Sequence, residues 1–348
     1  MSTPKNILVY AEVDDRNCQQ QVVDLAQSAG SSITVCEVVP SQPRSGDSRG
    51  VVERVHELRW ALAFQRLRQI CDRFAEHMDI DYGVFSGEPF IAITEQVHEQ
   101  GFDLVVHISP EADRSPFAGL NATGMHLMRK CPSAVWAMRA PTETNSNDVV
   151  VAVDRERGVR AERADGFARF ILETALAHAR ARSGKLHLVH AWQPFGTELL
   201  DHPSLALSDE EREFYCSQQR VESEDWFRGL LRDALGADVS EIILLDTTPE
   251  PGDFTAPNGV EVYPHLCLDD PVRAVTGVLE ATGSGLLVMG NVGSSAHPGV
   301  LIGPTTESLL AQCRVPTLAL KPSDYVSPLF MSPYKAPGGA SVNEIERL

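Results

Sequence analysis

The chain has 348 residues, and at roughly 150 residues per domain this length predicts two domains rather than one. Its composition, with 43% hydrophobic and 22% charged residues, is that of a globular protein and excludes extended disorder. The formal net charge of -18 disfavours nucleic acid and membrane surfaces as partners, because both are negatively charged. Since no apolar run is long enough to span a membrane and the N-terminus lacks the apolar stretch of a signal peptide, we expect a cytoplasmic protein.

In the first half of the chain, short apolar runs alternate with segments of helical spacing. Strands are expected at 6–13, 32–39, 80–85, 103–108 and 134–138. Helices are expected at 15–30, 51–77 and 89–100, with one more before the last strand. The 51–77 helix is predicted from an apolar stripe that includes Leu58, Leu62, Leu67 and Ile70.

The second half of the chain has the same order of elements. Strands are expected at 148–154, 186–192, 286–289 and 316–320. A long helix rich in alanine and arginine is expected to end at Gly184, where glycine is a common helix stop. Ser208 and Glu211 form the sequence signature of a capping box, which predicts a helix from this point to about Leu235.

An internal repeat explains this similarity between the halves. Residues 87–139 align with residues 269–321 without a gap, at a constant offset of 182. Matched pairs include Pro89 with Pro271, Gly101 with Gly283, and Cys131 with Cys313. Two copies of one domain account for the agreement, and strands that alternate with helices predict a parallel sheet covered on both faces. The expected fold is α/β, with two tandem doubly wound, Rossmann-like domains.

The expected domains are residues 1–140 and 148–322, joined by a polar linker, and residues 323–348 are expected to form a flexible tail. Residues 246–260 are turn-rich and are interpreted as an insertion in the second domain. The terminal strands of the two copies are predicted to pair within the chain, so that the domains pack as a pseudo-dimer. This pairing covers two sheet edges and leaves open whether whole chains form a further homodimer.

Cysteines and histidines indicate neither a disulfide framework nor a metal site. The seven cysteines are scattered and none forms a CxxC pair, so we expect reduced thiols. His187 and His190 alternate on one expected strand, but no third metal ligand accompanies them. Ordinary strand histidines are the favoured interpretation.

Glycines and hydroxyl residues gather after strand 286–289. Gly290 and Gly293 follow the strand, and Gly303 opens the next helix, where it precedes Thr305 and Thr306. Glycine lets backbone N–H groups approach a ligand closely, and a helix N-terminus offers unpaired donors to an anion. The arrangement predicts a phosphate-binding loop without a lysine, although a plain tight turn explains the two loop glycines as well.

Four segments together resemble a known family. They are Gly290-x-x-Gly293-x9-Gly303, VAVD at 151–154, HLMRKCPSAVW at 126–136 and LIGPTTESL at 301–309. The chain resembles the universal stress protein family, and within it the tandem, two-domain E-type bacterial members. The resemblance implies a role in the stress response. It also implies a domain that in some members binds ATP or another adenine nucleotide.

The same resemblance assigns residues to a nucleotide site. By position, Asp154 would meet the adenine or ribose, and Ala191 would lie beside the base through its backbone. The contacts with ribose and phosphates would fall on Gly290, Gly293, Gly303, Thr305 and Thr306.

Two departures from the family pattern bear on this expectation. Pro304 stands where the family commonly has Ser or Thr, and it removes one N–H and one hydroxyl from the phosphate site. In the first copy, Ile108 and Glu111 occupy the loop-glycine positions, Asn121 occupies the third, and Glu12 takes the place of the second copy's aspartate. Because bulk and negative charge oppose a phosphate, the N-terminal domain is predicted to have lost the nucleotide site.

Catalysis is not expected from this sequence. It contains no P-loop signature, and its phosphate site has no lysine, arginine clamp or metal-binding carboxylate, so we expect a binding protein with at most very slow ATP hydrolysis. Two alternatives remain open. One is an interaction protein that binds no nucleotide, with a partner that the sequence does not identify. The other is a carrier of a hydrophobic ligand in the first copy's cleft, near Ile108, Phe117 and Leu120.

Overall fold

The computed structural model describes residues 4–42, 49–75, 78–110, 120–140, 146–155, 161–236, 244, 254–256, 259–291, 302–331 and 344–347. The chain divides into two compact units. The N-terminal unit is built from Ser2–Glu143, Ala296–Gly303 and Leu310–Leu348, and the C-terminal unit from Thr144–Ser295 and Pro304–Leu309. Within the described ranges, every helix is too short or too polar to cross a membrane.

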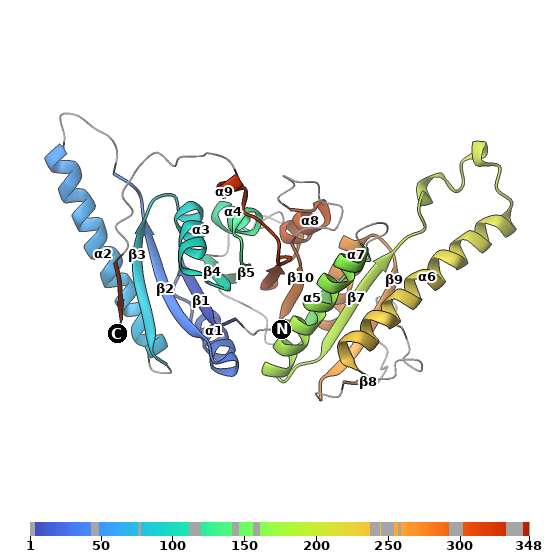
Figure 1. Ribbon diagram of the computed structural model, residues 1–348, viewed down its shortest axis with the longest axis horizontal. Helices are drawn as coiled ribbons and strands as arrows, with labels where there is room; N and C mark the ends of the chain where they lie inside the picture. The colour runs from blue at the N-terminus through green and yellow to red at the C-terminus, as the bar shows by residue number, and fades with distance from the viewer. Residues whose placement is uncertain are drawn as a thin grey trace. The chain divides into compact units, whose positions relative to one another are not determined.

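The N-terminal unit is an α/β unit with the strand order β12-β3-β2-β1-β4-β5-β11 (Figure 1). Its strands are β1 (Asn6–Ala11), β2 (Ser32–Val39), β3 (Ile80–Ser86), β4 (Leu104–Pro110), β5 (Ala134–Ala140), β11 (Thr317–Leu320) and β12 (Glu344–Arg347). Its helices are α1 (Arg16–Ala29), α2 (Arg49–Ala75), α3 (Pro89–Gln100), α4 (Ala122–Lys130) and α9 (Pro328–Met331). Neighbouring strands are parallel from β3 through β2, β1 and β4 to β5. At the two edges, β12 is antiparallel to β3, and β11 is antiparallel to β5.

The C-terminal unit has the strand order β10-β6-β7-β9-β8. Its strands are β6 (Val149–Ala152), β7 (Leu186–Trp192), β8 (Phe254–Thr255), β9 (Glu261–Leu268) and β10 (Leu286–Gly290). Its helices are α5 (Ala161–Ala181), α6 (Asp209–Leu235), α7 (Pro271–Thr282) and α8 (Pro304–Gln312), with short 3-10 turns η1 (Thr197–Leu199) and η2 (Pro203–Leu205). The strands from β10 to β9 are parallel neighbours, and β8 is antiparallel to β9. The doubly wound α/β fold expected from the sequence is therefore confirmed in both units.

The internal repeat recurs in the bounds of the helices. Helix α7 begins and ends 182 residues after α3, and α8 begins and ends 182 residues after α4. The glycines that follow α3 and α7, Gly101 and Gly283, both adopt the left-handed conformation, with φ of 74° and 62°. Because this conformation favours glycine, each residue stops its helix at the same point of the repeat.

The last strand of the second copy pairs with the last strand of the first. Leu318 of β11 lies opposite Trp136 of β5, in an antiparallel ladder that runs from Thr317 to Ala319. This confirms the predicted pairing of the two terminal strands. It also accounts for the grouping of β11 with the N-terminal unit, although the repeat assigns β11 to the second copy.

Local capping determines where the helices start. Ser208 accepts a hydrogen bond from the Glu211 N–H at 3.2 Å, and the Glu211 carboxylate accepts one from the Ser208 N–H at 2.9 Å. The predicted capping box is therefore present, and α6 begins directly after Ser208. Asp15 caps α1 in a simpler way, by accepting a hydrogen bond from the Cys18 N–H at 2.8 Å.

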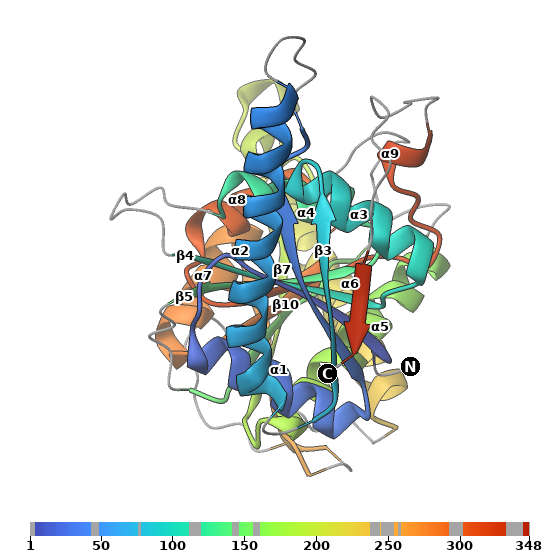
Figure 2. The same cartoon turned by 90° about the vertical axis from the view of Figure 1, so that its left-hand side faces the viewer.

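Helix α2 is buried along only half of its length. In its C-terminal half, Leu67 and Ile70 are buried against β2 and β3. In its N-terminal half, Leu58 and Leu62 are 60% and 54% exposed. The sequence predicts one stripe through all four residues, but at about 100° per residue Leu58 lies on the side of the helix opposite Leu67. The structure therefore divides the stripe: the sheet covers Leu67 and Ile70, whereas Leu58 and Leu62 are on an exposed face. The N-terminal turns of α2 also extend beyond the end of β3 (Figure 2).

The segment after β11 contacts the N-terminal unit. The buried ammonium of Lys321 donates to the carbonyl oxygen of Cys131 and lies 4.4 Å from the ring centre of Tyr325. In helix α9, Phe330 stacks on His98 of α3 at 4.2 Å between ring centres. Residues 323–331, which the sequence predicts to belong to a flexible tail, thus have defined contacts in the structure.

Candidate functional site

Three parallel strands of the C-terminal unit direct the candidate residues to one edge of the sheet. Asp154 follows the end of β6, Ala191 lies near the end of β7, and Gly290 ends β10. Since β6 pairs in parallel with both β7 and β10, these three positions share the carboxyl edge. Ligands of doubly wound folds bind beyond this edge. Asp154 is exposed and Ala191 is partly buried.

Gly290 has a packing role in the structure. A Cβ atom built on it would lie 2.9 Å from Cε1 of Phe167 and 3.1 Å from Cδ1 of Ile171, both on α5. The first distance is shorter than a normal contact between carbon atoms. A side chain at this position would force the Phe167 ring to shift, so glycine lets α5 pack closely against the end of β10. The sequence pattern did not suggest this reason.

The first turn of α8 is tied to the end of β10. The Thr306 hydroxyl donates to the carbonyl oxygen of Gly290 at 3.2 Å, and the Thr306 side chain is buried. Pro304 and Thr305, in the same turn, are exposed, and Gly303 directly before them is buried. The structure thus brings together Gly290 and Thr306 in one bond. The exposed Thr305 takes no part in this bond.

Two further residues complete the comparison with the expected site. Gly293 lies outside the described residues. Asn291, which follows Gly290 and was not singled out from the sequence, is fully buried. A polar residue directly after a buried strand is the signal that would have identified it, because buried polar side chains need hydrogen-bond partners.

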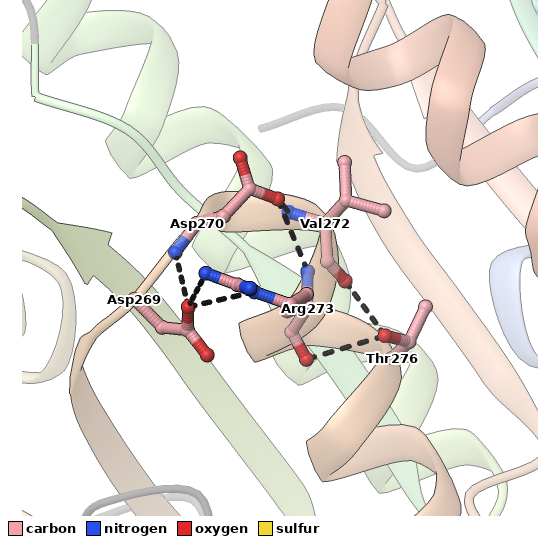
Figure 3. Close-up of polar contacts among 5 residues, drawn as sticks. All are labelled: Asp269, Asp270, Val272, Arg273 and Thr276. Carbon is pink, nitrogen blue, oxygen red and sulfur yellow. Dashed lines mark hydrogen bonds and ion pairs between the residues drawn. The ribbon is translucent and has the colours of Figure 1, made fainter. Parts of the chain in front are cut away.

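At the N-terminus of helix α7, carboxylates of the protein itself accept hydrogen bonds from the backbone N–H groups (Figure 3). Asp270 accepts hydrogen bonds from the N–H groups of Val272 and Arg273, at 2.9 and 3.3 Å. Asp269 accepts from the Asp270 N–H at 2.7 Å and from Arg273 Nε at 2.9 Å. Because these donors are used internally, the start of α7 is not available to an anion.

The N-terminal unit fills the corresponding place with side chains. Glu12 follows the last residue of β1, which pairs with Ile108 of β4. In the C-terminal unit, Asp154 follows β6 at the corresponding place. The Glu12 carboxylate accepts hydrogen bonds from His107 Nε2 at 3.0 Å and from Asn121 Nδ2 at 2.9 Å. Three residues far apart in the sequence are therefore joined in one polar network.

This network reaches the start of α4, the counterpart of α8. The Asn121 side-chain oxygen caps α4 by accepting a hydrogen bond from the Gly124 N–H at 2.8 Å. Burial alone would raise the pKa of the Glu12 carboxyl, but the hydrogen bonds from His107 and Asn121 outweigh burial and lower this pKa below its usual value. The N-terminal unit thus holds a carboxylate anion of its own close to the helix N-terminus. This arrangement supports the prediction that the unit lost its nucleotide site.

Of the three residues expected to line a hydrophobic cleft in the first copy, the structure describes Ile108 and Leu120. Ile108 is fully buried within the sheet, between β1 and β5, and is a core residue. Leu120 is partly buried. Phe117 and the loop residue Glu111 lie outside the described residues.

The strand histidines of the C-terminal unit pack within the fold. His187 Nδ1 lies 3.2 Å from Nε2 of His265, a partner that the sequence did not suggest, and His190 Nδ1 lies 3.3 Å from the carbonyl oxygen of Val153. Burial, with the neighbouring His265 and Lys185, lowers the pKa of His187 to about 3, so this ring is neutral at pH 7. In the part of the chain that the structure describes, no group of three His, Cys, Asp or Glu side chains is arranged to hold a metal ion.

Comparisons by sequence identify one family. The model of the Universal stress protein family matches residues 148–321, half of the chain. Universal stress protein E of Escherichia coli (strain K12) is 24% identical over 250 residues, which cover 71% of this chain and 69% of that protein. Two solved structures share the fold over nearly the whole chain, each at 17% identity.

The first of these structures is a functionally unknown protein from Pseudomonas aeruginosa PAO1, with a TM-score of 0.60 and coverage of 93% of this chain and 94% of that one. The second is a universal stress protein from Archaeoglobus fulgidus DSM 4304, with a TM-score of 0.55 and coverage of 91% of this chain and 98% of that one. Both align with the two copies together, which agrees with a tandem architecture.

Proposed function

Because the chain belongs to the universal stress protein family, we propose that it is a non-catalytic, cytoplasmic stress-response protein whose C-terminal unit binds an adenine nucleotide. The proposed contacts are Asp154, Ala191, Gly290, Gly293, Gly303, Thr305 and Thr306. One observation carries the proposal: the bond from Thr306 to Gly290 holds the start of α8 against the carboxyl edge of the sheet. An anion at this place would meet the positive end of the helix dipole.

The site suits binding better than hydrolysis. The sequence from Gly290 to Thr306 contains no lysine or arginine that could neutralise the charge of a transferring phosphoryl group. Pro304 also offers neither an N–H nor a hydroxyl to the outermost phosphate. The proposed ligand is therefore held mainly through its adenosine and inner phosphate, so AMP and ADP should bind about as well as ATP.

Isothermal titration of the full chain with ATP, ADP and AMP tests this proposal. Gly293→Leu should abolish binding, because a side chain would enter the space proposed for the phosphates. Glu111→Leu is the matched control, since it introduces the same side chain at the corresponding position of the first copy, and it should leave affinity unchanged. Equal effects of both variants, or binding that neither variant weakens, would overturn the proposed location.

A second candidate function is a protein-interaction role without a nucleotide. It is favoured by the packing of Phe167 into the space next to Gly290. Mass spectrometry of ligands released from the purified protein separates the candidates. A released adenine nucleotide supports the first, a lipid supports a carrier of hydrophobic ligands, and the absence of both together with no heat on titration supports the second.

A further inference from the structure

The exposed half of helix α2 carries a continuous apolar stripe. Val51, Val55, Leu58 and Leu62 are spaced by four, three and four residues, which places them on one face of three successive turns. Their exposed fractions are 55%, 46%, 60% and 54%. Single exposed apolar residues are ordinary, but four on one face form a surface that a partner can bury.

Positive charge borders this stripe. Arg54 lies on one side of it and Arg59 on the other, and both are exposed. Glu53 and Glu57 fall on the opposite side of the helix. In a protein with a net charge of -18, this apolar, arginine-flanked face is a local exception. A complementary partner would offer apolar side chains flanked by carboxylates.

Helix α6 presents a face of that description. Its N-terminal half extends beyond strands β7 and β9 (Figure 1), and Phe214 and Val221 are 64% and 56% exposed there. These two residues are seven apart and therefore share one face of the helix. Glu210 and Asp225 lie on the same face and are exposed, with the uncharged Gln218 between the two apolar residues.

We propose that the Val51–Leu62 face of α2 in one copy of this chain packs against the Phe214–Val221 face of α6 in a second copy. Both faces belong to every molecule, and both are exposed within one chain, so each copy can offer α2 to one contact and α6 to another. Apolar side chains would supply the affinity, and the arginine–carboxylate pairs would select the partner helix. The protein would then self-associate through its two long helices.

Sedimentation velocity of the full chain over a range of concentrations is the first test. We expect concentration-dependent self-association that weakens as salt is raised, because ions screen the charged pairs. Leu58→Glu should weaken association by roughly tenfold or more, since it places a charge where a leucine would be buried. Val326→Glu is the matched control, because Val326 is also exposed but lies outside both faces, and it should not alter association.

Charge reversal provides the decisive test. Arg54→Glu with Arg59→Glu, and separately Glu210→Lys with Asp225→Lys, should each weaken association. A mixture of the two variants should associate again through the reversed pairs. Circular dichroism and thermal unfolding establish that each variant is folded, because all the altered side chains are exposed. The proposal is overturned if the wild type is monomeric at all concentrations, if Leu58→Glu associates like the wild type, or if the mixture of variants fails to associate.

Discussion

The carboxylate of Glu12 accepts a hydrogen bond from Asn121 Nδ2 at 2.9 Å, although the two residues are 109 positions apart in the chain. Asn121 in turn caps helix α4, so the carboxylate is linked to the start of that helix. The corresponding helix, α8, begins at Pro304 directly after Gly303, and neither residue has a side chain that could make this link. The two copies of one fold thus differ at the place where a nucleotide phosphate is proposed to bind.

Removal of the Glu12 carboxylate should destabilise the protein. Glu12→Ala leaves the buried His107 without its Nε2 partner and removes two bonds from Asn121. Hydrogen bonds to a charged group contribute about 1.5–3 kcal/mol each, so we expect a loss of roughly that size or more. Urea unfolding measures it, and Asp154→Ala, at the exposed equivalent position, should cost less. Equal losses from both variants would contradict this account.

The packing of Gly290 can be separated from any role in binding. Gly290→Ala should lower the free energy of unfolding by about 1–3 kcal/mol, because the new Cβ would overlap Phe167. Phe167→Ala makes room for that Cβ, so the double variant should be more stable than the sum of the two single effects predicts. Urea unfolding of the four proteins gives the coupling energy. A coupling energy of zero would mean that Phe167 is not what excludes a side chain at residue 290.

Replacement of Pro304 should change nucleotide preference. Pro304→Ser restores an N–H and a hydroxyl at the first residue of α8, and a hydrogen bond to a charged phosphate contributes about 1.5–3 kcal/mol. We expect ATP affinity to rise by roughly tenfold or more, with AMP affinity nearly unchanged, since only the outer phosphate gains contacts. Isothermal titration of both proteins with both nucleotides measures this. An equal gain for AMP and ATP would place the new contacts elsewhere.

Because its ammonium is buried, Lys321 should make the free energy of unfolding depend on pH in the alkaline range. Burial lowers the pKa of Lys321 from 10.5 to about 8. Between these two values the unfolded chain holds the proton and the folded protein does not, so stability should rise as pH increases from about 8 to 10.5. Lys321→Met removes this group, and its unfolding free energy should lack that part of the rise. Urea unfolding at several pH values compares the two proteins, and identical pH profiles would contradict the prediction.

Much of the fold could be predicted because it depends on local pattern. The bounds of β2, β7 and α3 match the expected ranges, and α6 starts where the capping box places it. These elements are set by short-range features, namely apolar periodicity, a side chain that caps a helix, and a proline or glycine at a helix end. Strand β12 was not expected, because Glu344–Arg347 has no strong apolar alternation and is a strand only through its pairing with β3.

The candidate site was predictable in position but not in its contacts. The strand that ends at Gly290 and the helix that starts after Gly303 were both recognised, and their order along the chain places them at one edge of the sheet. Which side chains fill that edge depends on α5 and α8 packing against β10. The contacts of Gly290 with Phe167 and Thr306 join residues that no local pattern connects.

The sequence by itself determined the family, the repeated α/β order of elements and the likeness between the two copies. Tertiary structure decided how each copy satisfies its own polar groups: Glu12 with Asn121 in the first unit, and Thr306 with Gly290 in the second. It also decided which apolar side chains of α2 the sheet covers, such as Ile70, and which stay exposed, such as Leu58. The physical reason is range, since periodicity and capping act between neighbours in the chain, whereas burial and hydrogen-bond partners depend on residues that only the folded chain brings together.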